Sequence, residues 1–165
     1  IHYFHALADR SRRLGASAIS LHAGYAKNAD LRTVFDNVRR LQDSVFGPDV
    51  VVAVEGLYPN DVRPNLLGTW AEYEALLREG LPYAVDLSHL NVVQAAEGPR
   101  PDLVRELVSS PLAIEIHTSG NDGRHDQHAQ LAREPWWWTE LRHAGPNAII
   151  FSEANQVRGM RARAI

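Results

Sequence analysis

The sequence contains no cysteine, and this absence removes several kinds of chemistry at once. Without thiols there is no disulfide framework, no cysteine nucleophile and no thiolate ligand for a metal. The absence of cysteine does not indicate whether the protein works in a reducing or an oxidising compartment. Any metal ion bound by this chain must therefore use histidine and carboxylate ligands.

Long apolar runs and a strong charge imbalance are absent too. No stretch approaches the roughly 20 apolar residues that a membrane-spanning helix needs, so we expect no membrane partner and a cytoplasmic protein. The formal net charge of −3 gives no broad attraction for phosphate backbones, so we expect no nucleic-acid partner. The chain begins at Ile1 without methionine and without a signal-peptide pattern, which favours an N-terminus that was removed or left out.

What is present is an alternation of short apolar runs and amphipathic segments. With 165 residues, 45% of them hydrophobic, the chain can bury one ordinary core, and we treat 1–165 as a single domain. Strands are expected at 17–21, 49–54, 82–85, 112–116 and 148–151, helices at 1–14, 30–46, 69–78, 101–108 and 135–143, and a solvated basic end at 158–163.

Each expected strand delivers a polar residue at or just after its C-terminal end. These residues recur every 31 to 36 positions, the spacing of one strand-helix unit in a parallel barrel, and they are His22, Glu55, Asp86, His117 and Glu153. Because such barrels build active sites from the C-terminal ends of several strands, we expect the five side chains to converge. In a structural alternative, the acids pair with arginines or cap loops.

The segment after the fourth expected strand has the composition of a metal site. The apolar run ends at His117, and the following loop carries Asp122, His125, Asp126 and His128. Asp126 and His128 are two residues apart, so in an extended loop both can face one ion. Carboxylate oxygens together with imidazole nitrogens suit zinc, manganese, cobalt or iron better than calcium.

Two further patterns concern the surroundings of this site. Asp86 and His89 lie three residues apart where the third expected strand ends. Three consecutive tryptophans, 136–138, cannot all face one side of a helix. We expect one or two to pack inward and the remainder to cover a ligand or a partner surface, with packing favoured.

With the five strand-end residues, Asp86-Leu87-Ser88-His89 and the segment NDGRHDQHAQL (121–131), the chain resembles the xylose isomerase-like TIM-barrel superfamily. That superfamily includes sugar isomerases and epimerases, inosose dehydratase-like proteins and endonuclease IV. The resemblance runs from His22 to Glu153. It implies an α/β fold of the TIM type, a (β/α) barrel with about five βα units present here.

The resemblance also implies a role for each matching residue. The residues that match the family's central metal ligands are Glu55, Asp86, His117 and Glu153. The expected cofactor is a divalent metal: Mn, Co, Mg or Zn, with Fe as a further option. Asp126 and His128 match a pair that, with His89, binds a further zinc in endonuclease IV, and His22 matches another ligand of that multinuclear site. The implied catalytic residues are Glu55, Glu153 and His89, and the expected substrate contacts are His89, Arg124 and Trp136.

The chain departs from the family pattern in two places. Many sugar-type relatives follow the Asp-x-His pair with a Gly-Glu-Gly turn, where this chain has Ala132-Arg133-Glu134, so we expect a different loop geometry. A closed barrel needs eight strands and about 250 residues. We therefore expect an incomplete barrel that is part of a longer protein. The alternative is a shortened relative that closes its open edges by pairing with another chain.

Three hypotheses for function follow. The first is a metal-dependent sugar or sugar-phosphate isomerase or epimerase, in which Glu55 and Glu153 shuttle a proton around the metal. The second is a multinuclear phosphodiesterase of the endonuclease IV type, or a related multinuclear-iron oxidase. The third is a non-enzymatic domain with the tryptophans as its contact surface, against which the complete ring of polar residues argues. The expected partners are a small carbohydrate and, as one option, a second copy in a homo-oligomer.

Overall fold

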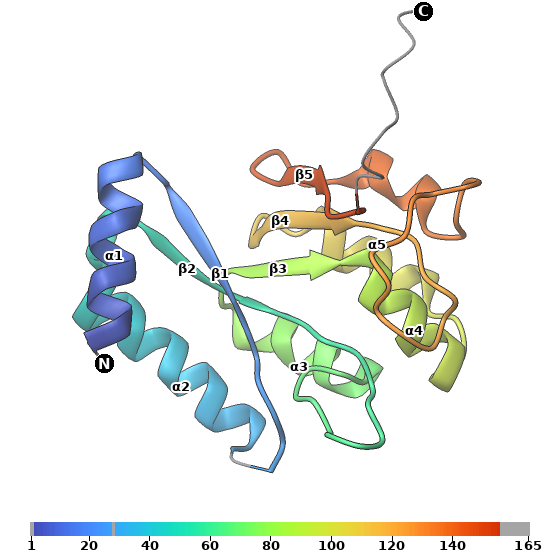
Figure 1. Ribbon diagram of the computed structural model, residues 1–165, viewed down its shortest axis with the longest axis horizontal. Coiled ribbons are helices and arrows are strands. Elements are labelled where there is room, and N and C mark those ends of the chain that lie inside the picture. Colours follow the sequence, from blue (N-terminus) through green and yellow to red (C-terminus); the bar gives the residue numbers. More distant parts are fainter. Residues whose placement is uncertain (1, 28, 156–165) are drawn as a thin grey trace, which may run out of the picture.

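The computed structural model describes residues 2–27 and 29–155 (Figure 1). The basic stretch 158–163, expected to be a solvated end, lies outside them. The α-helices and strands are, in chain order, α1 (His2–Leu14), β1 (Ala18–His22), α2 (Leu31–Leu41), β2 (Val51–Glu55), α3 (Trp70–Glu79), β3 (Tyr83–Asp86), α4 (Leu87–Glu97), α5 (Pro101–Ser109), β4 (Ala113–Thr118) and β5 (Ile149–Ser152).

The strands form one parallel sheet in the order in which they occur along the chain, β1-β2-β3-β4-β5. His22 lies opposite Glu55, and Asp86 lies opposite His117. Since all neighbours are parallel, the C-terminal ends of the five strands meet at one edge of the sheet. This confirms an α/β fold with five strands, and it is compatible with part of a TIM-type barrel. Within the described residues the sheet is open, with β1 and β5 at its sides.

The two faces of the sheet differ because successive side chains of a strand point in opposite directions. Val52, Val54 and Ile116 are at most 1% exposed and belong to the hydrophobic core, which also takes in apolar residues of α2, α3 and α5. In Figure 1, α2 and α3 lie along the same side of the strands. Alternation sends Glu55 and His117 to the opposite face. The helices therefore cover one face, and the candidate functional side chains occupy the other.

Local signals place the starts of two helices as predicted. Asp30 caps α2 by accepting a hydrogen bond from the backbone N–H of Thr33 at 2.7 Å. Thr69 caps α3 in the same way, through the backbone N–H of Glu72. The predicted helix 30–46 is regular only to Leu41, because a π-helical turn, Gln42–Phe46, follows it.

Helix α4 was not predicted from the sequence. Asp86 is both the last residue of β3 and the N-cap of α4, so no loop separates the two elements. Six residues of α4 are buried, and its apolar residues are distributed around the helix, which removes the amphipathic pattern on which the prediction depended. In the sequence, the residues of β3 and of α4 therefore form one mostly apolar stretch.

The predicted helix 135–143 was wrong in its first half, since a 3-10 helix at Trp138–His143 replaces it. The turn begins with the backbone N–H of Trp138 donating to the carbonyl of Pro135. Trp137 is 1% exposed and packs in the core, whereas Trp138 is 42% exposed. The inward packing of at least one tryptophan is thus confirmed.

Within residues 2–27 and 29–155, no helix combines the length and the apolar character needed to cross a bilayer.

Candidate metal centre

Strand ends bring the predicted residues together at one edge of the sheet. Nε2 of His22 lies 3.5 Å from Oε1 of Glu55, and the same oxygen lies 3.6 Å from Nδ1 of His117. Nδ1 of His117 is also 3.3 Å from Oε1 of Glu153, which follows β5. The convergence predicted from the spacing is therefore seen in the structure.

Two compact groups of side chains at this edge could hold a metal ion. The first consists of Glu55, Asp86 and His89, and the second of Asp86, His117 and Glu153. In each group one ligand atom from every residue lies within 4.8 Å of the others, and Asp86 belongs to both. We call these five residues the strand-end cluster.

Three buried polar atoms of this region make no hydrogen bond: Oδ2 of Asp86, Nδ1 of His117 and Oδ1 of Asp126. Buried polar atoms without a partner are costly and uncommon, so each calls for an explanation. Nδ1 of His117 does approach Glu55 and Glu153, but in directions that form no hydrogen bond. All three atoms are of types that bind metal ions, and Asp86 and His117 belong to one group whose ligand atoms lie close enough to share an ion.

Each of the two buried imidazoles, His89 and His117, uses one ring nitrogen in a hydrogen bond and turns the other toward the carboxylates. Nδ1 of His89 is 2.9 Å from the carbonyl oxygen of Gly56, which can only accept, so Nδ1 carries the proton and Nε2 faces the acids. Nε2 of His117 is 3.2 Å from Oε2 of Glu115, an interaction that leaves Nδ1 toward Glu55 and Glu153. Such outer partners commonly fix the tautomer of metal-binding histidines.

Carboxylates dominate the charge of the centre. Glu55, Asp86, Glu115, Asp126 and Glu153 gather here, and their salt-bridge partners are histidines. Among the described residues, no Lys or Arg nitrogen lies within 4.0 Å of these five carboxylates. Pairing of these acids with arginines is therefore wrong for the described part of the chain, whereas the capping role that the same alternative gave to the acids is seen for Asp86, the N-cap of α4.

The pKa values reflect this crowding of acids and imidazoles. Burial opposes the charging of His117, but the nearby Glu115 and Glu55 outweigh it and raise the pKa of His117 to about 10. Burial likewise opposes charging of His89, and Asp126 and Asp86 raise the pKa of His89 to about 9. Without a metal, the imidazoles are thus protonated at neutral pH and act as the cations of the cluster.

The two cluster glutamates respond in opposite directions. Burial favours the neutral form of Glu55, yet His117 and His22 outweigh it and lower the pKa of Glu55 to about 2. Burial raises the pKa of Glu153, and the nearby Asp86 and Glu55 raise it further against the opposing effect of His117. The environments of the two carboxyl groups therefore shift their pKa values in opposite directions, downward for Glu55 and upward for Glu153.

The loop after β4 adds Asp126 and His128 beside the cluster. Nε2 of His128 lies 3.0 Å from Oδ2 of Asp126, which is also 3.4 Å from Nε2 of His89. Nδ1 of His128 lies 3.7 Å from Oε2 of Glu153. His128 has a φ of 47°, an uncommon conformation for a residue other than glycine, and it directs this side chain back to the sheet edge.

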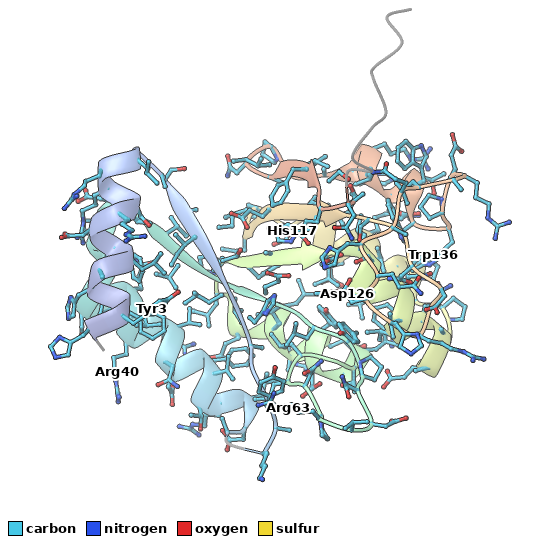
Figure 2. All side chains as sticks on the ribbon, viewed as in Figure 1. Tyr3, Arg40, Arg63, His117, Asp126 and Trp136 are labelled. Atoms are coloured by element: carbon cyan, nitrogen blue, oxygen red, sulfur yellow. The ribbon has the colours of Figure 1, made fainter. Side chains whose placement is uncertain are left out.

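The other polar residues of this loop lie apart from the cluster. Asp122 and His125 are exposed and pair with each other, Oδ2 to Nδ1, at 3.1 Å. Arg124 is exposed, and its backbone N–H donates to Asp122. Trp136 donates from Nε1 to Oδ1 of Asn91 and lines a separate hollow of about 660 Å³. Figure 2 shows the placement of Trp136 relative to Asp126.

Glu115 was missed from the sequence although it contacts His117 directly. It stands two residues before His117, and residues at this spacing share one face of a strand. A carboxylate inside an otherwise apolar run was the available signal. Tyr58 was missed as well: its ring centroid lies 5.0 Å from that of His89.

Comparison of the chain with models of known protein families and with curated proteins finds no match. The chemistry of the centre therefore has to follow from its own residues. What these establish is a buried group of Glu, Asp and His side chains that could hold a metal ion.

Proposed function

We propose that this chain provides the metal centre of a divalent-metal-dependent isomerase or epimerase acting on a sugar or sugar phosphate, within a xylose isomerase-like barrel. The observation that carries the proposal is Asp86, a buried carboxylate shared by two potential metal-binding groups at adjacent strand ends. Manganese, cobalt, magnesium or zinc would suit the mixed oxygen and nitrogen ligands.

The residues that would hold the ion are Glu55, Asp86, His117 and Glu153. These four residues form six pairs, and in five of them a ligand atom of one residue lies within 4.8 Å of a ligand atom of the other: Glu55 with His117 at 3.6 Å, and the pairs within the two compact groups. When bound, the metal polarises a carbonyl and its adjacent hydroxyl, which makes the substrate protons more acidic.

Proton transfer falls to the two glutamates. Glu153 is the better candidate for the group that gains and loses a proton at its carboxylate, because its side chain is 29% exposed and can exchange protons with solvent. Glu55 is 8% exposed and surrounded by histidines, which keeps it ionised. His128, 3.7 Å from Oε2 of Glu153, is positioned to pass the proton onward.

The test is a sugar panel with Glu153→Gln as the deciding variant. Metal-loaded protein is incubated with aldoses, ketoses and their phosphates in D₂O, and interconversion and deuterium incorporation are followed by NMR. We expect activity in the wild type, its loss in Glu153→Gln with the melting temperature retained, and full activity in Glu106→Gln, a matched change on the exposed face of α5. Near-normal activity of Glu153→Gln would remove this residue from the mechanism.

A second candidate function rests on Asp126 and His128. Their contacts with each other, with His89 and with Glu153 place additional ligands beside the strand-end cluster. A centre with two or three zinc or iron ions would favour phosphodiester hydrolysis or iron-dependent oxidation. Asp126→Asn should then lower the metal content by one ion per chain, whereas Asp122→Asn, an identical change on the exposed part of the same loop, should not.

A further inference from the structure

A second feature of the sheet edge is a hollow of about 270 Å³ beside the metal centre. It reaches from the candidate metal ligands to the loop that follows β2, and its lining includes His22, Tyr25, Tyr58, Arg63, His89 and Asp126. Arg63 is the one Lys or Arg among these lining residues. We call this space the Arg63 hollow.

The loop 57–67 that forms one wall is held in a defined shape. The backbone N–H of Leu57 donates to the carbonyl of Leu67 at 2.8 Å and so joins the two ends of the loop. Nδ2 of Asn65 donates to the carbonyl of Tyr58 at 2.9 Å. Oδ1 of Asn60 accepts from the backbone N–H of Arg63 at 3.0 Å. These bonds tie the side chains of Asn60 and Asn65 to the loop backbone, and the exposed Arg63 lines the hollow together with Tyr58.

Leu67 adds a strained conformation to this loop. Its φ is 54° although it is not glycine, and it is fully buried. Such strained conformations persist where the surrounding structure demands a particular backbone path. Leu67 and His128 are the two non-glycine residues with positive φ among those described, and both belong to loops that wall the metal centre.

The guanidinium of Arg63 is oriented but has no acidic partner. Its Cζ lies 3.7 Å from the ring centroid of Tyr25, a cation–π contact that restricts the side chain. No carboxylate of the described residues lies within 4.0 Å of its nitrogens. A planar guanidinium on a fixed base is well suited to bind a carboxylate or phosphate through two parallel hydrogen bonds.

We propose that Arg63 binds an anionic group of the substrate, a carboxylate or a phosphate, in the hollow between Tyr25 and Tyr58. The proposal rests on the proposed function, since it assumes that the reacting part of the same molecule lies at the strand-end cluster. The five carboxylates of the centre repel an anion, and Arg63 supplies the opposing charge at the far side of the hollow. The substrate is therefore oriented with its anionic end toward β1 and the loop after β2.

Of the substrate contacts expected from the sequence, His89 lines the Arg63 hollow, whereas Arg124 and Trp136 are not among its lining residues. Figure 2 shows Arg63 and Trp136 on different sides of Asp126. Arg63 belongs to a loop whose sequence contains no recognisable motif. The role of Arg63 can therefore be inferred only from the structure, which places this loop beside His89 and Asp126.

Calorimetric binding to the full chain tests the proposal with three probes: ribose 5-phosphate, glucuronate and neutral ribose. The proteins compared are the wild type, Arg63→Gln, Arg63→Lys and the control Arg32→Gln, which alters an exposed arginine of α2. Metal content is measured on every sample. Arg63→Gln should weaken binding of the preferred anionic probe by about 10- to 100-fold, Arg63→Lys by less, and Arg32→Gln not at all.

Each outcome is decisive. Preference for ribose 5-phosphate identifies a phosphate as the anion, and preference for glucuronate identifies a carboxylate. The proposal is overturned if Arg63→Gln binds both anions as the wild type does, if it loses neutral ribose equally, or if neither anion binds the wild type. If the wild type carries no metal and Arg63→Gln still weakens anion binding, the proposed function is contradicted while the anion site is supported.

Discussion

Replacement of Asp86 by asparagine separates the structural role of this residue from its role as a metal ligand. Oδ1 of Asp86 accepts from the backbone N–H groups of Ser88 and His89, at 2.7 and 3.3 Å, and so caps α4. Oδ2 is buried and makes no hydrogen bond. Asparagine caps helices about as well as aspartate, so it preserves the first role, while its amide nitrogen cannot replace a carboxylate ligand.

The expected sizes of the two effects differ clearly. Both variants lose the charge that faces His89, and metal-free Asp86→Ala should be about 1 kcal/mol less stable than metal-free Asp86→Asn, because only the alanine variant loses the cap. Metal at 100 times its Kd stabilises the wild type by about 2.7 kcal/mol, or about 5–10 °C in Tm for a chain of this length. A loss of affinity of about 100-fold reduces this gain to about 0.4 kcal/mol, or about 1 °C.

The assay is thermal unfolding of wild type, Asp86→Asn and Asp86→Ala, each with chelator and with added manganese or zinc. Metal content after dialysis gives a second readout that does not depend on stability. A metal-induced rise in Tm of Asp86→Asn equal to that of the wild type would refute the assignment of Asp86 as the shared ligand. Equal stability of Asp86→Asn and Asp86→Ala in chelator would contradict the account of the cap.

Three further predictions concern pH, the outer partner of a histidine, and the approach of a glycine to a tyrosine. The pKa values of His89 and His117 are raised to about 9 and about 10 in the metal-free fold, above the unfolded value of about 6.5, so their contribution to stability is complete below pH 6.5 and is lost as the pH rises through these values. The Tm of chelated protein should therefore fall between pH 7 and 10.5, and a flat profile would contradict the ion pairing. Glu115→Gln should weaken metal binding about 10- to 100-fold by loosening the His117 ring, measured by competition with a chelating dye, and unchanged affinity would argue against this positioning role. Gly56→Ala should destabilise the protein by about 1–3 kcal/mol in urea unfolding, because the added methyl overlaps the buried ring of Tyr73, and wild-type stability would show that the ring can move aside.

The strand ends were predictable because two independent patterns coincide there. Strands buried on both faces appear as continuous apolar runs, and the first polar residue after each run marks its C-terminal end. The regular spacing of Glu55, Asp86 and His117 then indicated repeated strand-helix units, and parallel pairing brings such residues to one edge. Pairing and register, not loop details, decide the position of these side chains, which explains why the sequence was sufficient for them.

The remaining parts depended on contacts that leave no local pattern. Helix α4 follows β3 without a loop and is apolar around its circumference, so periodicity could not separate the two elements. Glu115 is hidden in an apolar run, and its importance follows from its distance to His117. Arg63 acquires meaning only from the fold of loop 57–67 against the sheet edge. Closure into a barrel depends on strands beyond the five described and stays a prediction.

The most direct test is the metal content of the full chain, purified without chelator and measured by elemental mass spectrometry. The account predicts at least one divalent ion per chain, lost on Asp86→Asn and retained on Asp122→Asn. About one manganese, cobalt, magnesium or zinc ion supports the isomerase or epimerase proposal, and two or three zinc or iron ions shift it to the multinuclear alternative. A chain that binds no divalent metal, even after reconstitution with each of these ions, would contradict the central claim that the strand-end cluster is a metal centre.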